Sequence, residues 1–233
     1  MIINKIEFPI YITLILLSFV IAINFIYIFL KKQNINKNNI LIYISTIIPF
    51  GLLLSIVICY LIDKDGGLSS YVGCFTLILS SIFYEKINPS NNNYYIKSTI
   101  MSLPLIYGIS KLGCFFVGCC YGIPYSGILN VTYTSGLNIK LFPIQLLESI
   151  IFIILFICIL LIYKKNKNNI IEITILICAL SKLLLDFLRY DHINKLVTTN
   201  QIISLILIIL IIVNYIIRKL NKNANNNIIK IRK

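Results

Sequence analysis

Long runs of apolar residues are the feature that most constrains this chain. A helix needs roughly 20 predominantly apolar residues to cross the hydrocarbon of a bilayer. Five blocks approach that length, and two shorter ones become plausible spans if neighbouring helices bury them. The long blocks are 8–30, 40–62, 143–163, 170–188 and 201–217, and the short ones are 71–84 and 98–109. We therefore predict seven membrane-spanning helices, with six as the alternative.

The composition excludes an ordinary soluble domain. Hydrophobic residues make up 58% of the chain and charged residues 12%, whereas soluble domains are about half apolar and a quarter charged. The first block is too long for a cleaved signal peptide and lacks a small-residue cleavage site, so we expect it to remain as a span. The predicted fold class is an all-α polytopic membrane protein. We expect one transmembrane domain over residues 1–220 and a basic cytoplasmic tail over 221–233.

The net charge of +13 is distributed unevenly between the connections. If seven spans alternate, fourteen basic residues fall on one side of the membrane and six on the other. Basic residues concentrate on the cytoplasmic side, so the N-terminus is predicted outside and the C-terminus inside. Topology and attraction to anionic lipid explain the basic tail better than nucleic-acid binding does. We expect no nucleic-acid partner.

The segment 110–122 interrupts the apolar pattern at the outer end of the fourth predicted span. It combines Lys111 with three glycines and with Cys114, Cys119 and Cys120. Irregular backbone at membrane depth is tolerated only beside protein or a water-filled cavity, so we expect this segment to form the wall of a site. The cysteines could be small packing residues, a disulfide or metal ligands. Their spacing, with the single His192 elsewhere, is not a recognised zinc pattern, and we predict no metal.

Two further segments place charges inside predicted spans. Gln145 and Glu148 are three residues apart and share one helix face. Lys182, Asp186 and Arg189 follow at i, i+4 and i+7, which predicts one polar stripe on the sixth helix. Such intramembrane charges mark a functional cavity by default, although a self-neutralising Lys–Asp pair is the simpler reading. With the lysine of segment 110–122, the predicted pocket is net positive and suits a lipid phosphate in the outer leaflet.

These polar segments, taken in order, resemble those of the prolipoprotein diacylglyceryl transferases. The resemblance covers roughly residues 60–210. It is carried by Gly66-Gly67-Leu68-Ser69, Gly113 to Gly122, Pro143-x-Gln145-Leu146-x-Glu148, Lys182-x3-Asp186-x2-Arg189 and Thr198 to Ser204. The cysteine-rich form of the second segment is similar to a divergent branch of that family.

The resemblance implies a reaction at the outer face of the bacterial cytoplasmic membrane. The family transfers diacylglycerol from phosphatidylglycerol to the lipobox cysteine thiol of a preprolipoprotein, and glycerol phosphate leaves. The implied partners are therefore an anionic phospholipid and a preprolipoprotein signal peptide, and no cofactor or metal is implied.

The resemblance also assigns roles to individual residues. Lys111 and Lys182 stand where the family has arginine and would hold the phosphate, although an ammonium lacks the guanidinium fork. Tyr71 stands where many members have histidine and would hydrogen-bond the head group. The remaining candidates would bind substrate or orient the cations: Gly118, Gly122, Gln145, Glu148, Asp186, Arg189, Cys114, Cys119 and Cys120.

Two other functions remain open at this stage. A cysteine near Lys111 would have a lowered pKa, which suits a thiol-dependent lipid or acyl transferase that uses Cys114, Cys119 or Cys120 as its nucleophile. An inactive homologue that only binds lipid is the third possibility, because the lysine replacements weaken phosphate binding.

Overall fold

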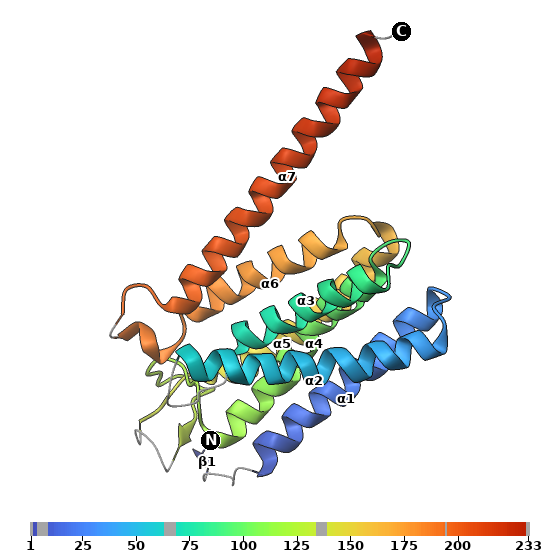
Figure 1. The fold of residues 1–233 in the computed structure, drawn as a ribbon. Helices are drawn as coiled ribbons and strands as arrows, with labels where there is room; N and C mark the ends of the chain where they lie inside the picture. The colour runs from blue at the N-terminus through green and yellow to red at the C-terminus, as the bar shows by residue number, and fades with distance from the viewer. Residues whose placement is uncertain (1, 4–8, 63–68, 134–138, 194, 232–233) are drawn as a thin grey trace.

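The computed structural model describes residues 2–3, 9–62, 69–133, 139–193 and 195–231, and seven α-helices run through these segments (Figure 1). The predicted number of helices is therefore confirmed. Their bounds are α1 Pro9–Lys32, α2 Lys37–Ile62, α3 Ser70–Ile87, α4 Tyr94–Val117, α5 Ile144–Lys165, α6 Ile170–Asp186 and α7 Thr199–Ile231.

Five of these helices, α1, α2, α4, α5 and α7, are long and apolar enough to cross a membrane. Together they make the chain a polytopic membrane protein. The fourth predicted span is longer than expected, because the 98–109 stretch lies inside the 24-residue helix α4. We expected irregular backbone through segment 110–122, and this was wrong for its first half. The helix continues through Lys111 and Cys114 and ends at Val117.

Successive helices alternate in direction, as the predicted topology requires. The turns from α1 to α2, α3 to α4 and α5 to α6 lie at one end of the bundle (Figure 1). The ends of α2, α4 and α6 and the starts of α3, α5 and α7 gather at the opposite end, which we call the site end. Which end faces the cytoplasm stays a prediction.

Helix α4 lies at the centre of the bundle and packs against α1, α3, α5 and α6. It is the most buried of the long apolar helices. Small residues permit this close packing, as is usual between membrane helices. A Cβ atom added at Gly108 would lie 3.1 Å from the backbone oxygen of Ser149 in α5. Buried hydroxyls such as Ser98 and Ser102 donate hydrogen bonds to carbonyls of the preceding turn, so they need no outside partner.

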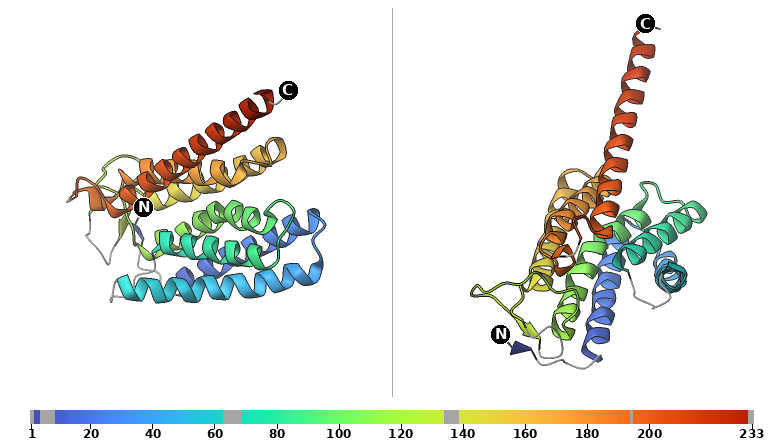
Figure 2. Two further views of the ribbon diagram at one scale, coloured as in Figure 1. Left: turned by 45° about the horizontal axis from the view of Figure 1, so that its top comes forward. Right: turned by 90° about the vertical axis from the view of Figure 1, so that its left-hand side faces the viewer.

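Helix α7 leaves the bundle and has little of its surface buried (Figures 1 and 2). It packs mainly along α6. The helix continues to Ile231 and so enters the basic segment 221–233. The division of the chain into a membrane domain and a tail stays a prediction.

Backbone pairing at the site end ties the connecting loops together. Strand β1 (Ile2–Ile3) pairs in parallel with β2 (Thr132–Tyr133), which follows α4. An isolated bridge joins Gly122 to Arg189, so the loop after α4 is fastened to the turn after α6. This pairing holds two of the predicted site segments side by side.

Candidate functional site: a buried cationic pocket

Glu148 is the centre of a buried charge network at the site end. This fully buried carboxylate in the first turns of α5 lies 3.0 Å from Lys111 Nζ of α4. It also accepts hydrogen bonds of 2.7 and 3.1 Å from Arg189 Nη2. Burial lowers the pKa of Arg189, but attraction to Glu148 outweighs burial and the net pKa lies above its ordinary value. Helices α4 and α5 and the turn after α6 are therefore joined at one carboxylate.

Tyr107 joins this network to Lys182 and was missed by the sequence analysis. Its hydroxyl donates to Glu148 Oε1 at 2.9 Å and accepts from Lys182 Nζ at 2.5 Å. The ammonium of Lys182 also lies 4.0 Å from the centre of the Tyr107 ring, within cation–π range. The available signal was the spacing, because Tyr107 precedes Lys111 by one helical turn on the same face.

Asp186 does not pair with Lys182, contrary to the simplest reading of the sixth helix. Among the described residues, it accepts hydrogen bonds from Thr198 Oγ1 and from Asn200 Nδ2, the latter at 3.1 Å. Arg189 Nε lies 3.5 Å from the same carboxylate and His192 Nε2 lies 3.7 Å away. The prediction of one helical stripe was also inexact, because α6 ends at Asp186 and Arg189 lies in the following turn. Two residues of the Thr198 to Ser204 segment therefore hold the Asp186 carboxylate by hydrogen bonds.

Tyr71 lies in the first turn of α3 beside Lys182. Its hydroxyl is 2.6 Å from Ser204 Oγ and donates to the Asn200 carbonyl at 3.2 Å, so it points at α7. Its ring lies 5.0 Å from Lys182 Nζ. These contacts support a role in positioning the lysine, and the predicted contact with a head group stays a prediction. The neighbouring motif residues 66–68 lie outside the described residues.

A tight turn brings the cysteines together after α4. Gly118 takes a left-handed conformation with φ of 72°, and both Gly118 N and Cys119 N donate to the Cys114 carbonyl. Gln145 Nε2 donates to the Cys119 carbonyl at 2.7 Å and fixes the turn to α5. Glycine at this position is the usual way to end a helix. Gly118 and Gln145, which both match the family pattern, therefore shape and hold this turn.

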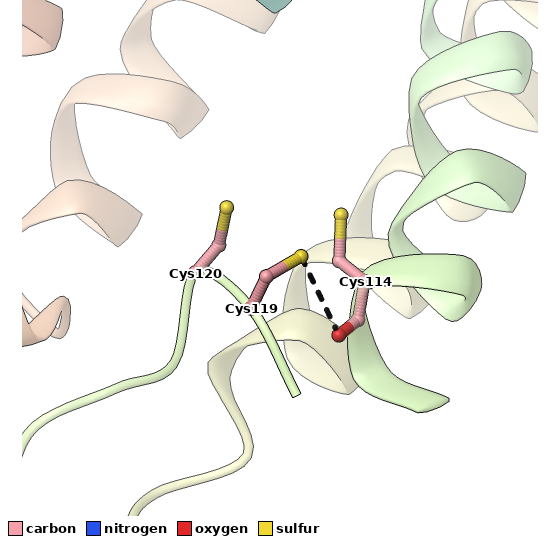
Figure 3. Close-up of side chains that lie close together, drawn as sticks. All are labelled: Cys114, Cys119 and Cys120. Carbon is pink, nitrogen blue, oxygen red and sulfur yellow. Dashed lines mark hydrogen bonds between the residues drawn. The ribbon is translucent and has the colours of Figure 1, made fainter. Parts of the chain in front are cut away.

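The sulfur atoms of Cys114, Cys119 and Cys120 all lie within 4.8 Å of one another. Figure 3 shows Cys119 Sγ directed at Cys114, whose carbonyl accepts its hydrogen bond at 3.8 Å. No disulfide joins any of the three, so all are free thiols. Hydrogen bonds from Cys114 and Cys119, together with the charges of Lys111 and Arg189, hold the pKa of Cys120 below its usual range.

Replacing Gly118 with alanine should destabilise the protein by about 1–2 kcal/mol, the cost of placing a Cβ in the left-handed region. The new Cβ would also lie 2.7 Å from the ring of Tyr133. Gly73→Ala is the matched control, because within the described part of the chain a Cβ there meets only Ser55 Oγ, at 3.8 Å. Unfolding by denaturing detergent in mixed micelles would measure both. Equal stability of the two variants would contradict the argument.

Two cavities meet beside the charge network. The more polar of the two, which we call the polar cavity, has a volume of about 350 Å³ and lies among α1 to α4. Lys111, Arg189 and the three cysteines line it. An apolar cavity of about 550 Å³ lies mainly among α3, α4, α6 and α7, and Lys182 lines it. Ser70, Cys74, Leu103 and Tyr107 belong to both walls. A charged group and a long apolar group of one ligand could therefore lie on either side of Tyr107.

The fold and the site together define a polytopic membrane protein with a buried cationic pocket beside an apolar cavity. The profile of the family described as prolipoprotein diacylglyceryl transferase matches residues 1–217. The chain therefore belongs to the prolipoprotein diacylglyceryl transferase family, as its motifs predicted.

Three curated relatives carry the name phosphatidylglycerol–prolipoprotein diacylglyceryl transferase. The Clostridium tetani protein is 31% identical over 119 residues, which is 48% of either chain. The second such enzyme of Clostridium perfringens is 28% identical over 129 residues, or 52% of this chain and 50% of its own. The Clostridioides difficile protein is 30% identical over 166 residues, or 69% and 65%. The chain thus spans about half to two thirds of the length of the relatives it matches.

Proposed function

We propose that this protein transfers the diacylglyceryl group of phosphatidylglycerol to the lipobox cysteine of a preprolipoprotein at the outer face of the bacterial cytoplasmic membrane. The observation that carries the proposal is the pair of adjoining cavities. One is polar and cationic, the other is apolar, and Tyr107 belongs to both walls. A phospholipid has the same division between an anionic phosphate and acyl chains. The named relatives support the choice of donor and acceptor.

In the proposed reaction the sulfur of the acceptor cysteine attacks the glycerol carbon that carries the phosphate ester. A carbon–sulfur bond forms while the carbon–oxygen bond breaks. The electron pair of the broken bond leaves with glycerol phosphate, and the thiol proton is released. The main barrier is therefore the negative charge that develops on the departing phosphate, together with deprotonation of the thiol.

The cations of the network are placed to stabilise the departing phosphate. Lys111 and Arg189 line the polar cavity, and Glu148 holds both in position. Lys182 donates a hydrogen bond to Tyr107, which belongs to the walls of both cavities. Three basic side chains face two carboxylates, Glu148 and Asp186, which leaves a formal charge of +1 for an anionic ligand. Preorganised charges of this kind cost no reorganisation during the reaction.

The test uses the full-length protein in phosphatidylglycerol vesicles with a lipobox peptide, and mass spectrometry of the peptide. We expect the peptide thiol to gain one diacylglyceryl group, and we expect no gain in phosphatidylcholine vesicles. A typical family enzyme serves as the positive control. An unmodified peptide beside a modified control would refute the proposal. A lipid adduct on Cys114, Cys119 or Cys120 of the protein would instead establish the thiol-nucleophile alternative.

A further inference from the structure

The cluster of Cys114, Cys119 and Cys120 is built by features that a loop of packing cysteines does not require. Cys120 has a φ of 53°, a left-handed conformation that costs a non-glycine residue about 1–2 kcal/mol. The turn at Gly118 brings the other two sulfurs to the same place, and Gln145 fixes it. All three cysteines line the polar cavity that Lys111 and Arg189 also line. The thiols are therefore held together at the place where the acceptor thiol would react.

Three thiols in this arrangement match the ligands of a d¹⁰ metal ion such as zinc. Zinc binds thiolates at about 2.3 Å, which places two tetrahedral sulfur ligands roughly 3.8 Å apart. The three sulfurs already lie within 4.8 Å of one another. The remaining difference of about 1 Å is within reach of small side-chain rotations. Three protein ligands also leave the fourth position open, which is the pattern of catalytic rather than structural zinc sites.

Neither carboxylate of the charge network is a free base for the acceptor thiol. Glu148 is bound by Lys111 and Arg189. Asp186 accepts hydrogen bonds from Thr198 and Asn200. A carboxylate held in this way is stabilised as the anion and is a weak proton acceptor. A metal removes the need for a strong base, because a coordinated thiol is deprotonated outright.

We propose that Cys114, Cys119 and Cys120 bind one zinc-class ion whose open fourth position takes the sulfur of the acceptor cysteine. The second half of this inference rests on the proposed function. On binding, the acceptor thiol loses its proton to water and its sulfur donates an electron pair to the ion. The bound thiolate then forms the carbon–sulfur bond while glycerol phosphate leaves with the electron pair of the carbon–oxygen bond. Neither step oxidises or reduces any group.

The surrounding charges favour such an ion. Three thiolates and one divalent cation carry a formal charge of −1, and a fourth thiolate makes it −2. Lys111 and Arg189 line the same cavity, and the formal charge of +1 on the network would offset part of this charge. The network is thus suited to a thiolate-bound ion on one side and to a phosphate on the other.

The first measurement is metal binding by the reduced, chelator-treated full-length protein in detergent. Titration with Cd²⁺ should show a sulfur-to-cadmium charge-transfer band that saturates at one ion per chain, and Zn²⁺ should displace it. X-ray absorption should count three sulfur ligands. The triple Cys114→Ser, Cys119→Ser, Cys120→Ser variant should lose the band. The matched control, Cys158→Ser with Cys178→Ser, should keep it, because those residues lie in α5 and α6.

The second measurement adds a lipobox peptide to the cadmium-loaded protein. The sulfur count should rise from three to four with the cysteine peptide and stay at three when serine replaces that cysteine. A band retained by the triple serine variant, a disulfide among the three cysteines of the unreduced protein, or a sulfur count that stays at three would each overturn the inference.

These readouts do not depend on turnover, so the two proposals fail separately. Three sulfurs rising to four without any peptide lipidation would support the metal site and refute the transferase. Lipidation of the peptide by chelator-treated protein at an unchanged rate would support the transferase and overturn the metal site.

Discussion

Replacing Lys111 with alanine is expected to lower the rate of diacylglyceryl transfer by about 100- to 1,000-fold, the usual cost of removing one preorganised donor from a developing oxyanion. Lys111 is buried at 3.0 Å from Glu148 and lines the polar cavity. The vesicle assay with the lipobox peptide measures the effect. Phosphate stabilisation is a property of the transition state, so we expect the fall mainly in kcat rather than in KM.

Two variants control this experiment. Lys140→Ala removes an exposed lysine near the site end and should leave the rate unchanged. Lys111→Arg supplies a guanidinium fork that holds phosphate in a bidentate manner, so it should retain or exceed the original rate. A loss of less than threefold in Lys111→Ala, or an equal loss in Lys140→Ala, would remove Lys111 from the phosphate site.

Replacing Glu148 with alanine is expected to destabilise the protein by about 3–5 kcal/mol, because two buried cations lose their shared partner. The side chains of Glu148 and Lys111 are 1% and 6% exposed. Unfolding by denaturing detergent in mixed micelles measures the change. A double-mutant cycle with Lys111→Met should recover part of the loss, since it removes one of the two unpaired cations.

The matched control for Glu148 is Glu172 in α6. Glu172 pairs with Arg218 of α7, and the two side chains are 22% and 62% exposed, so solvent reaches this pair far more than it reaches Glu148. Exposed ion pairs contribute about 0–1 kcal/mol, so Glu172→Ala should have little effect on stability. Similar losses in the two variants would mean that burial does not control the strength of these pairs.

The charged site residues found from the sequence share one property, which is that each lies in or beside an apolar block. Lys111, Glu148 and Lys182 are conspicuous for this reason. Tyr107 is not, because a tyrosine in an apolar helix is ordinary until its hydroxyl is placed beside a carboxylate and an ammonium. The pairing of charges was equally hidden. Asp186 is one helical turn from Lys182 in sequence. The chain after α6 turns back, however, and Asp186 instead accepts hydrogen bonds from Thr198 and Asn200.

The clustering of the three cysteines was hidden in the sequence in the same way. Their spacing matched no recognised metal pattern, since such patterns assume a local loop of known shape. The left-handed turn at Gly118 and the conformation of Cys120 bring the three sulfurs together, and neither is visible in the spacing.

The sequence alone determined that the chain is an all-helical protein that crosses a membrane several times, because hydrocarbon selects apolar segments of fixed length whatever their neighbours are. It also determined the family, through polar residues that hydrocarbon would otherwise exclude. Only the tertiary structure decided which charges meet, where α4 ends and where the two cavities adjoin. These depend on contacts between residues far apart in the chain, and local composition does not specify such contacts.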